Sequence, residues 1–545
     1  MMYRTQYLSS PCRNFHMLGY TGFTDPKDGR AKVAMVSFAD FTLGSLYLVD
    51  PRTQEVEHYT LPLDEGAWAV NNWQDKAIII GTCAQSGCIH KFDLETRTFA
   101  EPLRTETETY IWTLAEGCDG CFYGGTYGNC HLVKYDPAAH VLTDLGRVCE
   151  NKKNLYSRYT AAKDGYILID VQNDDAYTAA YSIADGTFCR AADIGITESA
   201  QSLRALKDPR SEYGALLPDG SLVMVKGQSY LFWETDSTEP VTHRIPGEAP
   251  VSGIFAMEYD GKGGLWGATA FGMTMFRYDI EDGTYYNTVE TTLKGGGEIY
   301  GIVHTRDKFY MTSYSAGFHL GYDPAKPFVT DQNPYVIHRA GPEYIRPHAR
   351  SVIGPKGNIW TGFYAKYGTY GGALTRMDIE TEEVTLFEVE NRTIADVAAD
   401  ETYVYYATHG NGNGLPTLKE AFKLVKVDSD CNQICSVTLP EGVVPENIYV
   451  FDGKLYLCAL DALYIYNPDT LSLLTTLPLP SGRLMLRYDG KLLVFGGKNE
   501  AYLLDGEHDS YEKIADTTFP VFMARTVGDT VYYACGTELW KLTKE

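Results

Sequence analysis

The side chains best suited to chemistry are concentrated in one short segment, Tyr344-Ile-Arg-Pro-His-Ala-Arg350. An arginine guanidinium can bind a carboxylate through two parallel hydrogen bonds. Histidine and tyrosine can accept or donate a proton during a reaction. This combination is suited to neutralising a substrate carboxylate while a proton is removed from the neighbouring carbon.

Three other stretches of the sequence add side chains of the same kinds. They are Tyr314-Ser-Ala-Gly317, the run from Tyr364 to Gly372, and His409-Gly-Asn-Gly-Asn-Gly414. From their types we predict His348, Tyr364 and Arg346 as catalytic residues. The predicted substrate-binding residues are Arg350, Tyr344, Lys366, Tyr367, His409 and Tyr314.

A repeated phrase indicates which elements position these residues. An alternating strand ends in an acidic turn and is followed by a second strand, as in LYLVDPRTQEVEHYTL from Leu46 and LTRMDIETEEVTLFEV from Leu374. The turn residue recurs at intervals of 38 to 55 residues, and a truncated last copy begins at Leu539, which gives 12 units. Each unit also has an upstream pair of strands joined by a Gly/Asp turn, so a unit holds four antiparallel strands.

A four-stranded repeat of this length is typical of a β-propeller blade. The sequence therefore predicts an all-β chain of about 12 four-stranded blades. Since a ring usually holds four to eight blades, we expect two propellers, divided 7+5 or 6+6. Residues 1–32 are predicted as an N-terminal segment, 33–290 as blades 1 to 6, and 291–545 as blades 7 to 12.

The last unit ends after its third strand, and the N-terminal stretch NFHMLGYTGF from Asn14 could supply the missing one. In that case one ring would be inserted in the other. In a propeller, the starts of the first strands and the loops after the second strands converge on one face, where the predicted site residues would meet. The turn acids are expected on the outer part of the opposite face, bonded to backbone N–H groups.

Other first strands provide weaker candidates for the same face. These are Trp68, Tyr110, Trp112, Tyr156 and Arg158, whose aromatic members could stack on sugars or fill a ring.

Charge and composition exclude several classes of partner. Lys and Arg number 47 against 71 Asp and Glu, a net charge of −24, which repels nucleic acid and anionic membranes. We see no signal peptide and no run of apolar residues long enough for a transmembrane helix. The 12 Cys occupy no fixed place in the repeat, so we expect reduced thiols and a cytoplasmic location.

Two short motifs carry a resemblance. Gly125-Thr-Tyr127 with Tyr135-Asp-Pro137, and the run from Tyr367 to Leu374, resemble large bacterial propeller proteins with PQQ-like or quinoprotein-type repeats. A looser resemblance is to propeller polysaccharide lyases such as oligogalacturonate lyase. That resemblance implies site residues among His348, Arg346, Tyr364 and His409, and it makes a divalent metal the one candidate cofactor.

We predict a carbohydrate-active enzyme, a lyase that cleaves a uronic-acid-containing glycan or oligosaccharide by β-elimination. One alternative is a glycoside hydrolase, which needs two carboxylates, with Glu298, Glu343 and Asp396 as candidates. The other is a non-catalytic scaffold that binds protein or glycan. The expected partner of the enzyme is a small molecule or an oligosaccharide.

Overall fold

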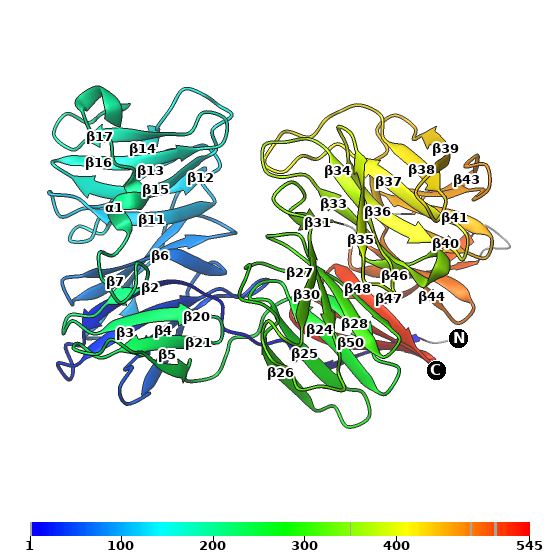
Figure 1. Ribbon diagram of the computed structural model, residues 1–545, viewed down its shortest axis with the longest axis horizontal. Helices are drawn as coiled ribbons and strands as arrows, with labels where there is room; N and C mark the ends of the chain where they lie inside the picture. Colours follow the sequence, from blue (N-terminus) through cyan, green and yellow to red (C-terminus); the bar gives the residue numbers. More distant parts are fainter. Residues whose placement is uncertain (1–2, 349, 461, 480–481, 506–509) are drawn as a thin grey trace. The chain divides into compact units, whose positions relative to one another are not determined.

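The chain folds into two compact units. The computed structural model describes residues 3–348, 350–460, 462–479, 482–505 and 510–545 (Figure 1). Unit 1 consists of Met1–Asn14 and Val251–Glu545, and unit 2 consists of Phe15–Pro250. The chain of unit 2 is therefore an insertion in the chain of unit 1.

The described strands of unit 1 form seven antiparallel sheets in which each strand pairs with its neighbour. The first three are β23 (Ile254–Tyr259), β24 (Gly264–Thr269), β25 (Thr274–Asp279) and β26 (Tyr285–Glu290); β27 (Ile299–Thr305), β28 (Lys308–Ser313), β29 (Phe318–Tyr322) and β30 (Tyr335–Arg339); and β31 (Arg346–Pro347), β32 (Val352–Ile353), β33 (Ile359–Tyr364), β34 (Gly372–Met377) and β35 (Val384–Val389), with the 3-10 helix η2 (Pro355–Gly357) between β32 and β33. The next are β36 (Thr393–Ala399), β37 (Val404–His409), β38 (Lys423–Val427) and β39 (Gln433–Thr438); β40 (Pro445–Phe451), β41 (Lys454–Ala459), β42 (Leu463–Tyr466) and β43 (Leu473–Leu477); β44 (Gly482–Tyr488), β45 (Lys491–Gly496), β46 (Glu500–Asp505) and β47 (Ser510–Asp516); and β48 (Val521–Val527), β49 (Thr530–Cys535), β50 (Glu538–Lys544) and β1 (Tyr3–Ser9).

Unit 2 repeats the same pattern. Its strands are β2 (Met17–Thr24), β3 (Ala31–Ser37), β4 (Ser45–Val49) and β5 (Val56–Thr60); β6 (Gly66–Trp73), β7 (Ala77–Cys83), β8 (Cys88–Asp93), β9 (Thr98–Phe99) and β10 (Leu103–Arg104); β11 (Tyr110–Glu116), β12 (Phe122–Tyr127), β13 (His131–Asp136) and β14 (Val141–Arg147); β15 (Tyr156–Lys163), β16 (Tyr166–Gln172), β17 (Tyr177–Ser182) and β18 (Thr187–Arg190); and β19 (Ala215–Leu216), β20 (Leu222–Lys226), β21 (Ser229–Trp233) and β22 (Val241–Arg244). The middle three groups are joined edge to edge by the single pairs Tyr110–Cys83 and Tyr127–Tyr156. The helices η1 (Ala191–Ile194) and α1 (Ala200–Arg204) lie between β18 and β19 in the chain.

Hydrophobic burial explains why the sheets stack. The second strands are largely apolar, and every residue of β7 and β33 is buried. A core cluster joins Phe23 and Ala34 of one sheet to Ile78, Ile80 and Phe92 of the next. A single four-stranded sheet cannot bury both of its faces, so each sheet is stabilised by its neighbours.

The turn acids lie where the sequence placed them, in the turns between the third and fourth strands. Asp50 accepts hydrogen bonds from the backbone N–H groups of Arg52 (2.9 Å) and Thr53 (3.2 Å). Asp378 repeats the arrangement with Glu380 (2.9 Å) and Thr381 (3.0 Å). Their predicted structural role is confirmed, and they explain much of the negative charge without a ligand.

Two details differ from the sequence-based prediction. The strand that pairs with β50 is Tyr3–Ser9, in register Tyr3 to Lys544, and not the stretch from Asn14, which instead leads into β2 of unit 2. The predicted division after residue 290 also differs from the compact units, because β23–β26 belongs to unit 1.

The close approach of β12 and β15 gives a stability prediction. A Cβ at Gly125 would lie 1.8 Å from the carbonyl oxygen of Ser157, so alanine there must push two backbones apart. We expect Gly125→Ala to destabilise unit 2 by about 3 kcal/mol and lower its melting temperature by roughly 6–12 °C. Gly296→Ala is the control, since nothing lies within 4 Å of that Cβ. Equal melting temperatures for the two variants would contradict the packing described.

Candidate functional site

In most of the four-stranded sheets, the first strand has a β-bulge near its start. This bulge sets the direction of one side chain. A bulge inserts an extra residue that has no partner across the ladder and re-aims its side chain. In unit 1 the inserted residues are Phe255, Tyr300, Ala395, Glu446, Arg483 and Phe522.

Bulge side chains of neighbouring sheets touch one another. The rings of Phe255 and Tyr300 lie 4.8 Å apart, edge to face, and the Arg483 guanidinium lies 5.3 Å from the ring centre of Phe522. The first strands also follow one another in space, and β48 lies against β23. The bulges therefore collect polar and aromatic side chains from distant parts of the chain on one face.

Arg346 is surrounded by tyrosine side chains at this face. Its guanidinium lies 4.1 Å from the ring centre of Tyr314, and its Nη2 donates to the Tyr367 hydroxyl at 3.1 Å. The hydroxyls of Tyr314 and Tyr367 are hydrogen-bonded at 3.0 Å. The structure thus brings together the start of a first strand and two loops that follow second strands, as the sequence predicted.

In the described chain Arg346 and Arg483 form no direct salt bridge, although Glu298 interacts electrostatically with Arg346 and Glu446 with Arg483. Within the described ranges, no carboxylate lies at salt-bridge distance from either guanidinium, and the Nε of each is buried without a hydrogen-bond acceptor. Burial lowers the pKa of Arg346, but the neighbouring Tyr300, Tyr367 and Tyr314 raise it by more. Arg346 therefore stays charged and can pair with an anion.

His348 is held in one tautomer. Its Nδ1 lies 3.0 Å from the carbonyl oxygen of Ile394 and 2.9 Å from that of Ala395, so Nδ1 carries the hydrogen and donates it. Burial lowers the pKa of His348, although these carbonyls and Asp396 oppose the shift. The ring is therefore neutral at pH 7, and the lone pair of Nε2 is available as a base.

Tyr364 packs directly against His348. The two rings are 4.7 Å apart and nearly perpendicular, at 82°. Burial raises the pKa of Tyr364, while a hydrogen bond from the Asn411 side chain opposes that shift. The hydroxyl stays protonated, and it can donate its proton beside the histidine base.

His409 has the opposite tautomer to His348. The backbone N–H of Asn411 donates to its Nδ1 at 3.0 Å, so the hydrogen of the neutral ring is on Nε2. The ring stacks on Phe422 at 5.2 Å. Burial, followed by the nearby His348, lowers the pKa of His409 to about 4. His409 is therefore a neutral hydrogen-bond donor near the base.

We name the residues that the structure brings together the Arg346 cluster: Tyr314, Arg346, His348, Tyr364, Tyr367 and His409. Three predicted substrate-binding residues are engaged elsewhere. Arg350 lies 3.7 Å from Asp396, Lys366 forms an exposed ion pair with Glu343 at 2.8 Å, and the hydroxyl of Tyr344 is directed to Glu388.

Two of the three carboxylates proposed for a hydrolase are engaged in other contacts. Asp396 is buried and accepts a hydrogen bond from the backbone N–H of Ile448 at 2.9 Å, which links β36 to β40. Glu343 is bound to Lys366. Glu298 is buried near Arg346 and contributes to the raised pKa of that arginine.

Sequence reasoning did not single out Arg483, Glu446, Phe255 or Phe522. Each lies at the second position of its first strand. Alignment of the repeats on that position would have shown a polar or aromatic residue between two apolar or small ones, as in Gly482-Arg-Leu484 and Val521-Phe-Met523.

The candidate metal is not supported by the side chains present. In the part of the chain that the structure describes, no three His, Cys, Asp or Glu side chains are grouped closely enough to hold a metal ion. His348 and His409 each use Nδ1 in a backbone contact.

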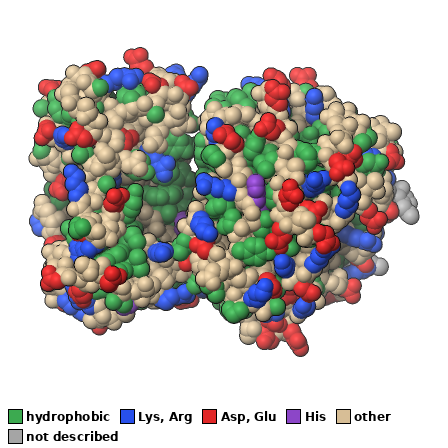
Figure 2. Space-filling model, viewed as in Figure 1, with side chains coloured by type: hydrophobic (Ala, Val, Ile, Leu, Met, Phe, Trp, Pro, Cys, Tyr) green, Lys and Arg blue, Asp and Glu red, His purple; other side chains and the backbone are tan. Residues whose placement is uncertain are grey.

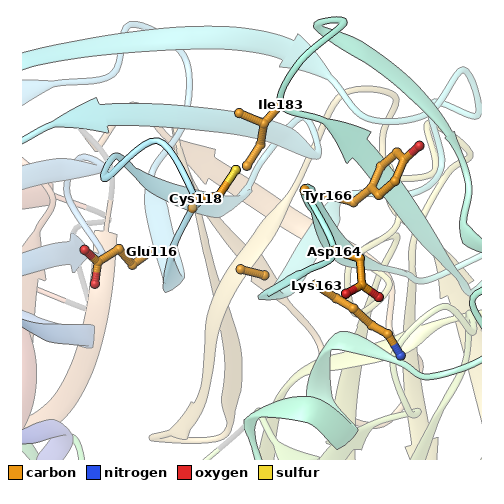
Figure 3. A pocket seen from close by; sticks show the side chains of 9 residues that line it. Glu116, Cys118, Lys163, Asp164, Tyr166 and Ile183 are labelled. Atoms are coloured by element: carbon orange, nitrogen blue, oxygen red, sulfur yellow. The ribbon is translucent and has the colours of Figure 1, made fainter.

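A cavity of about 350 Å³ in unit 2 lacks converging functional groups. It lies between the β11–β12 and β15–β16 turns, with Cys118 and Ile183 in its lining. Figure 3 shows Glu116 and Lys163 directed away from one another, and Lys163 is paired with Glu198 at 2.5 Å. We assign no chemistry to it.

The surface charge is dispersed. Figure 2 shows acidic and basic side chains interspersed over the visible face. None of the described helices has the length and apolar character needed to cross a membrane.

Acidification is expected to weaken unit 1 through His409. Its folded pKa of about 4 lies below the ordinary 6.5, so the unfolded chain binds more protons between these values. The free energy of unfolding should therefore fall as pH drops from about 6.5 to about 4. His409→Asn, which cannot titrate, should show a smaller fall in urea titrations at the two pH values. If the free energy of unfolding depends on pH identically in the wild type and in His409→Asn, the lowered pKa of His409 is contradicted.

No family model and no curated protein matches this sequence. Solved structures do match in fold. The WD40 β-propeller domain of Doa1 is 11% identical with a TM-score of 0.42, covering 54% of this chain and 93% of that one. BamB from Moraxella catarrhalis is 10% identical with a TM-score of 0.40, covering 61% and 96%.

The extracellular domain of the hybrid two-component system BT4673 from B. thetaiotaomicron is 11% identical with a TM-score of 0.39. It covers 99% of this chain and 82% of that one. At this level of identity the likeness concerns the fold alone. The described chain is an all-β repeat protein built from four-stranded antiparallel sheets.

Proposed function

We propose that the chain is a lyase that cleaves a uronic-acid-containing oligosaccharide by β-elimination at the Arg346 cluster. The observation that carries the proposal is the neutral His348, with its Nε2 lone pair available, close to an arginine that forms no direct salt bridge in the described chain. Such a site is complementary to a carboxylate with an acidic hydrogen on the adjacent carbon.

In the proposed step, Arg346 binds the uronate carboxylate. The carboxylate is thereby neutralised, which stabilises the negative charge that develops when C5 loses its proton. Nε2 of His348 takes that proton, and the C5–H electron pair forms the C4=C5 double bond. The C4–O bond breaks, and the Tyr364 hydroxyl gives its proton to the leaving oxygen.

The contact between the rings of His348 and Tyr364 predicts the stereochemistry. Base and acid lie 4.7 Å apart by ring centres, so they reach the same side of one sugar ring. We therefore expect proton and leaving group to depart from the same face. After the step, solvent exchanges a proton from His348 back to Tyr364.

We also infer the arrangement of the blades. In unit 1 the first strands follow one another from β23 to β48, and β48 returns to β23, which supports a closed ring of seven. In unit 2 the order runs from β19 through β2, β6 and β11 to β15, where α1 packs, which supports a ring of five. The Arg346 cluster would then lie at the mouth of the larger ring. The cytoplasmic location and the absence of nucleic-acid and membrane partners stay predictions.

The carboxylate-binding role is tested by Arg346→Ala. With a uronic-acid oligosaccharide as substrate, we expect kcat/KM to fall at least about 100-fold, because a charge-assisted contact that strengthens in the transition state is lost. Arg376→Ala is the control, since Arg376 also lies over a ring, that of Phe387 at 5.8 Å, but is bound to Ser429 and Asp430. If both variants keep the wild-type kcat/KM, Arg346 does not bind the substrate carboxylate.

A further inference from the structure

Unit 2 has its own bulge side chains. The residues without a ladder partner in β6, β11 and β15 are Trp68, Trp112 and Arg158, each at the third position of its strand. These correspond to the bulge positions of unit 1. The same structural device therefore presents a different set of side chains in each unit.

The unit 2 side chains form a continuous aromatic platform, which we define as Trp68, Tyr110, Trp112, Tyr127 and Tyr156. Trp112 lies 4.8 Å from Trp68 and stacks on Tyr110 at 5.0 Å with 19° between the planes. Tyr156 continues the platform at 5.8 Å from Trp112 and 4.5 Å from Tyr127. All five side chains are half-buried, so part of each ring remains accessible.

A cation lies on this platform. The Arg158 guanidinium is 5.1 Å from the Trp112 ring centre and 5.5 Å from that of Tyr159. Over the described ranges, no carboxylate pairs with Arg158, although the protein carries 71 acidic residues. An arginine held on aromatic faces, with no anion, is suited to bind one.

Two further observations indicate a ligand. The indole Nε1 of Trp112 is buried and has no acceptor among the residues described, which leaves a donor unsatisfied. Tyr159 lines a cavity of about 570 Å³ together with Tyr20, Gln201 and Arg204. Arg204 donates to the carbonyl oxygens of Leu114 (3.0 Å) and Thr160 (3.1 Å) and has no carboxylate partner in the described chain.

We infer that unit 2 is a second, non-catalytic binding site for a carboxylate-bearing sugar. A sugar would contact the accessible parts of the Trp112 and Tyr110 rings, and its carboxylate would pair with Arg158. The cavity has the size of a small-ligand site. The ligand class follows from the arginines and aromatic rings of unit 2, and it does not depend on the elimination proposed for unit 1.

The test uses the full chain with the Arg346 cluster disabled by His348→Ala and Arg346→Ala. Calorimetry with a uronic-acid trisaccharide is expected to show one remaining site. Adding Arg158→Ala should weaken binding roughly 10- to 100-fold. Arg190→Ala is the matched control, because Arg190 also lies over a tyrosine, Tyr177 at 4.0 Å, but is paired with Asp175. It should leave the affinity unchanged.

The aromatic contribution is measured with Trp112→Ala and Trp112→Phe. Alanine should weaken binding about 10-fold, and phenylalanine should restore part of the affinity, because it keeps a stacking ring and loses the N–H donor. The carboxyl-reduced, neutral trisaccharide should bind at least about tenfold more weakly than the acidic one.

Melting curves identify any variant that fails to fold, and Trp112→Phe then replaces Trp112→Ala. The inference is overturned if the disabled chain binds no trisaccharide, if Arg158→Ala and Trp112→Phe bind like their parent, or if the neutral sugar binds equally well. If the wild-type chain shows no elimination but the disabled chain still binds the trisaccharide, only the proposed function is contradicted.

Discussion

Replacement of His348 with alanine is expected to lower kcat for elimination by about 10³-fold, within the range that general base catalysis contributes. The structure gives the reason. Nδ1 is held by the carbonyls of Ile394 and Ala395, so Nε2 is the single nitrogen that can accept the proton of the substrate. His409 is also neutral, but its Nδ1 lone pair accepts the backbone N–H of Asn411 and its hydrogen is on Nε2, so it offers no free lone pair to the substrate.

A matched control separates loss of the base from loss of structure. His304 stacks on Phe309 at 4.7 Å, and His304→Ala should leave kcat unchanged. His348→Asn can still donate to a backbone carbonyl and should keep the melting temperature near wild type while activity is lost. A His348→Asn protein with wild-type kcat would show that another group is the base.

The pH profile provides a second check on His348. Because burial holds its pKa below 6.5, the base stays unprotonated through the neutral range. We expect kcat/KM to be flat from pH 8 to about 6.5 and to decrease only at lower pH, as Nε2 becomes protonated.

Deletion of the first nine residues is expected to unfold unit 1 and to spare unit 2. β1 pairs with β50 from Tyr3–Lys544 to Ser9–Leu539, and Tyr7 packs on Trp540 at 5.6 Å. Removing it exposes the edge of β50 and costs several backbone hydrogen bonds, each worth about 1 kcal/mol. Mild proteolysis should then leave a resistant fragment that corresponds to residues 15–250.

The control for the deletion is a substitution in the same strand. Tyr7→Phe keeps the ring against Trp540 and all backbone pairs, so its melting curve should match that of the wild type. If the deleted chain melts like the wild type and resists proteolysis throughout, β1 does not hold the last sheet of unit 1 together.

The repeated strands were predictable because their alternation and their turn acids, such as Asp50 and Asp378, are set by local chemistry. The meeting of Arg346 with Tyr314 and Tyr367 followed from the repeat as well. The closing strand was not predictable, because Tyr-Arg-Thr-Gln-Tyr-Leu-Ser has only one partner strand and carries no turn signal.

The bulge residues of unit 1 were not predicted from the sequence, for a different physical reason. A bulge interrupts the two-residue alternation, so Arg483 and Phe522 look like ordinary strand positions in the sequence. Their direction becomes visible only when the ladder pairs are known.

The most direct test of the account is the absorbance of the unsaturated product during incubation with a uronic-acid oligosaccharide. The account predicts that the wild-type chain forms the C4=C5 double bond and that His348→Asn, folded and still able to bind the substrate, does not. Absence of unsaturated product with the wild-type chain across uronic-acid oligosaccharides, or undiminished product with His348→Asn, would contradict it.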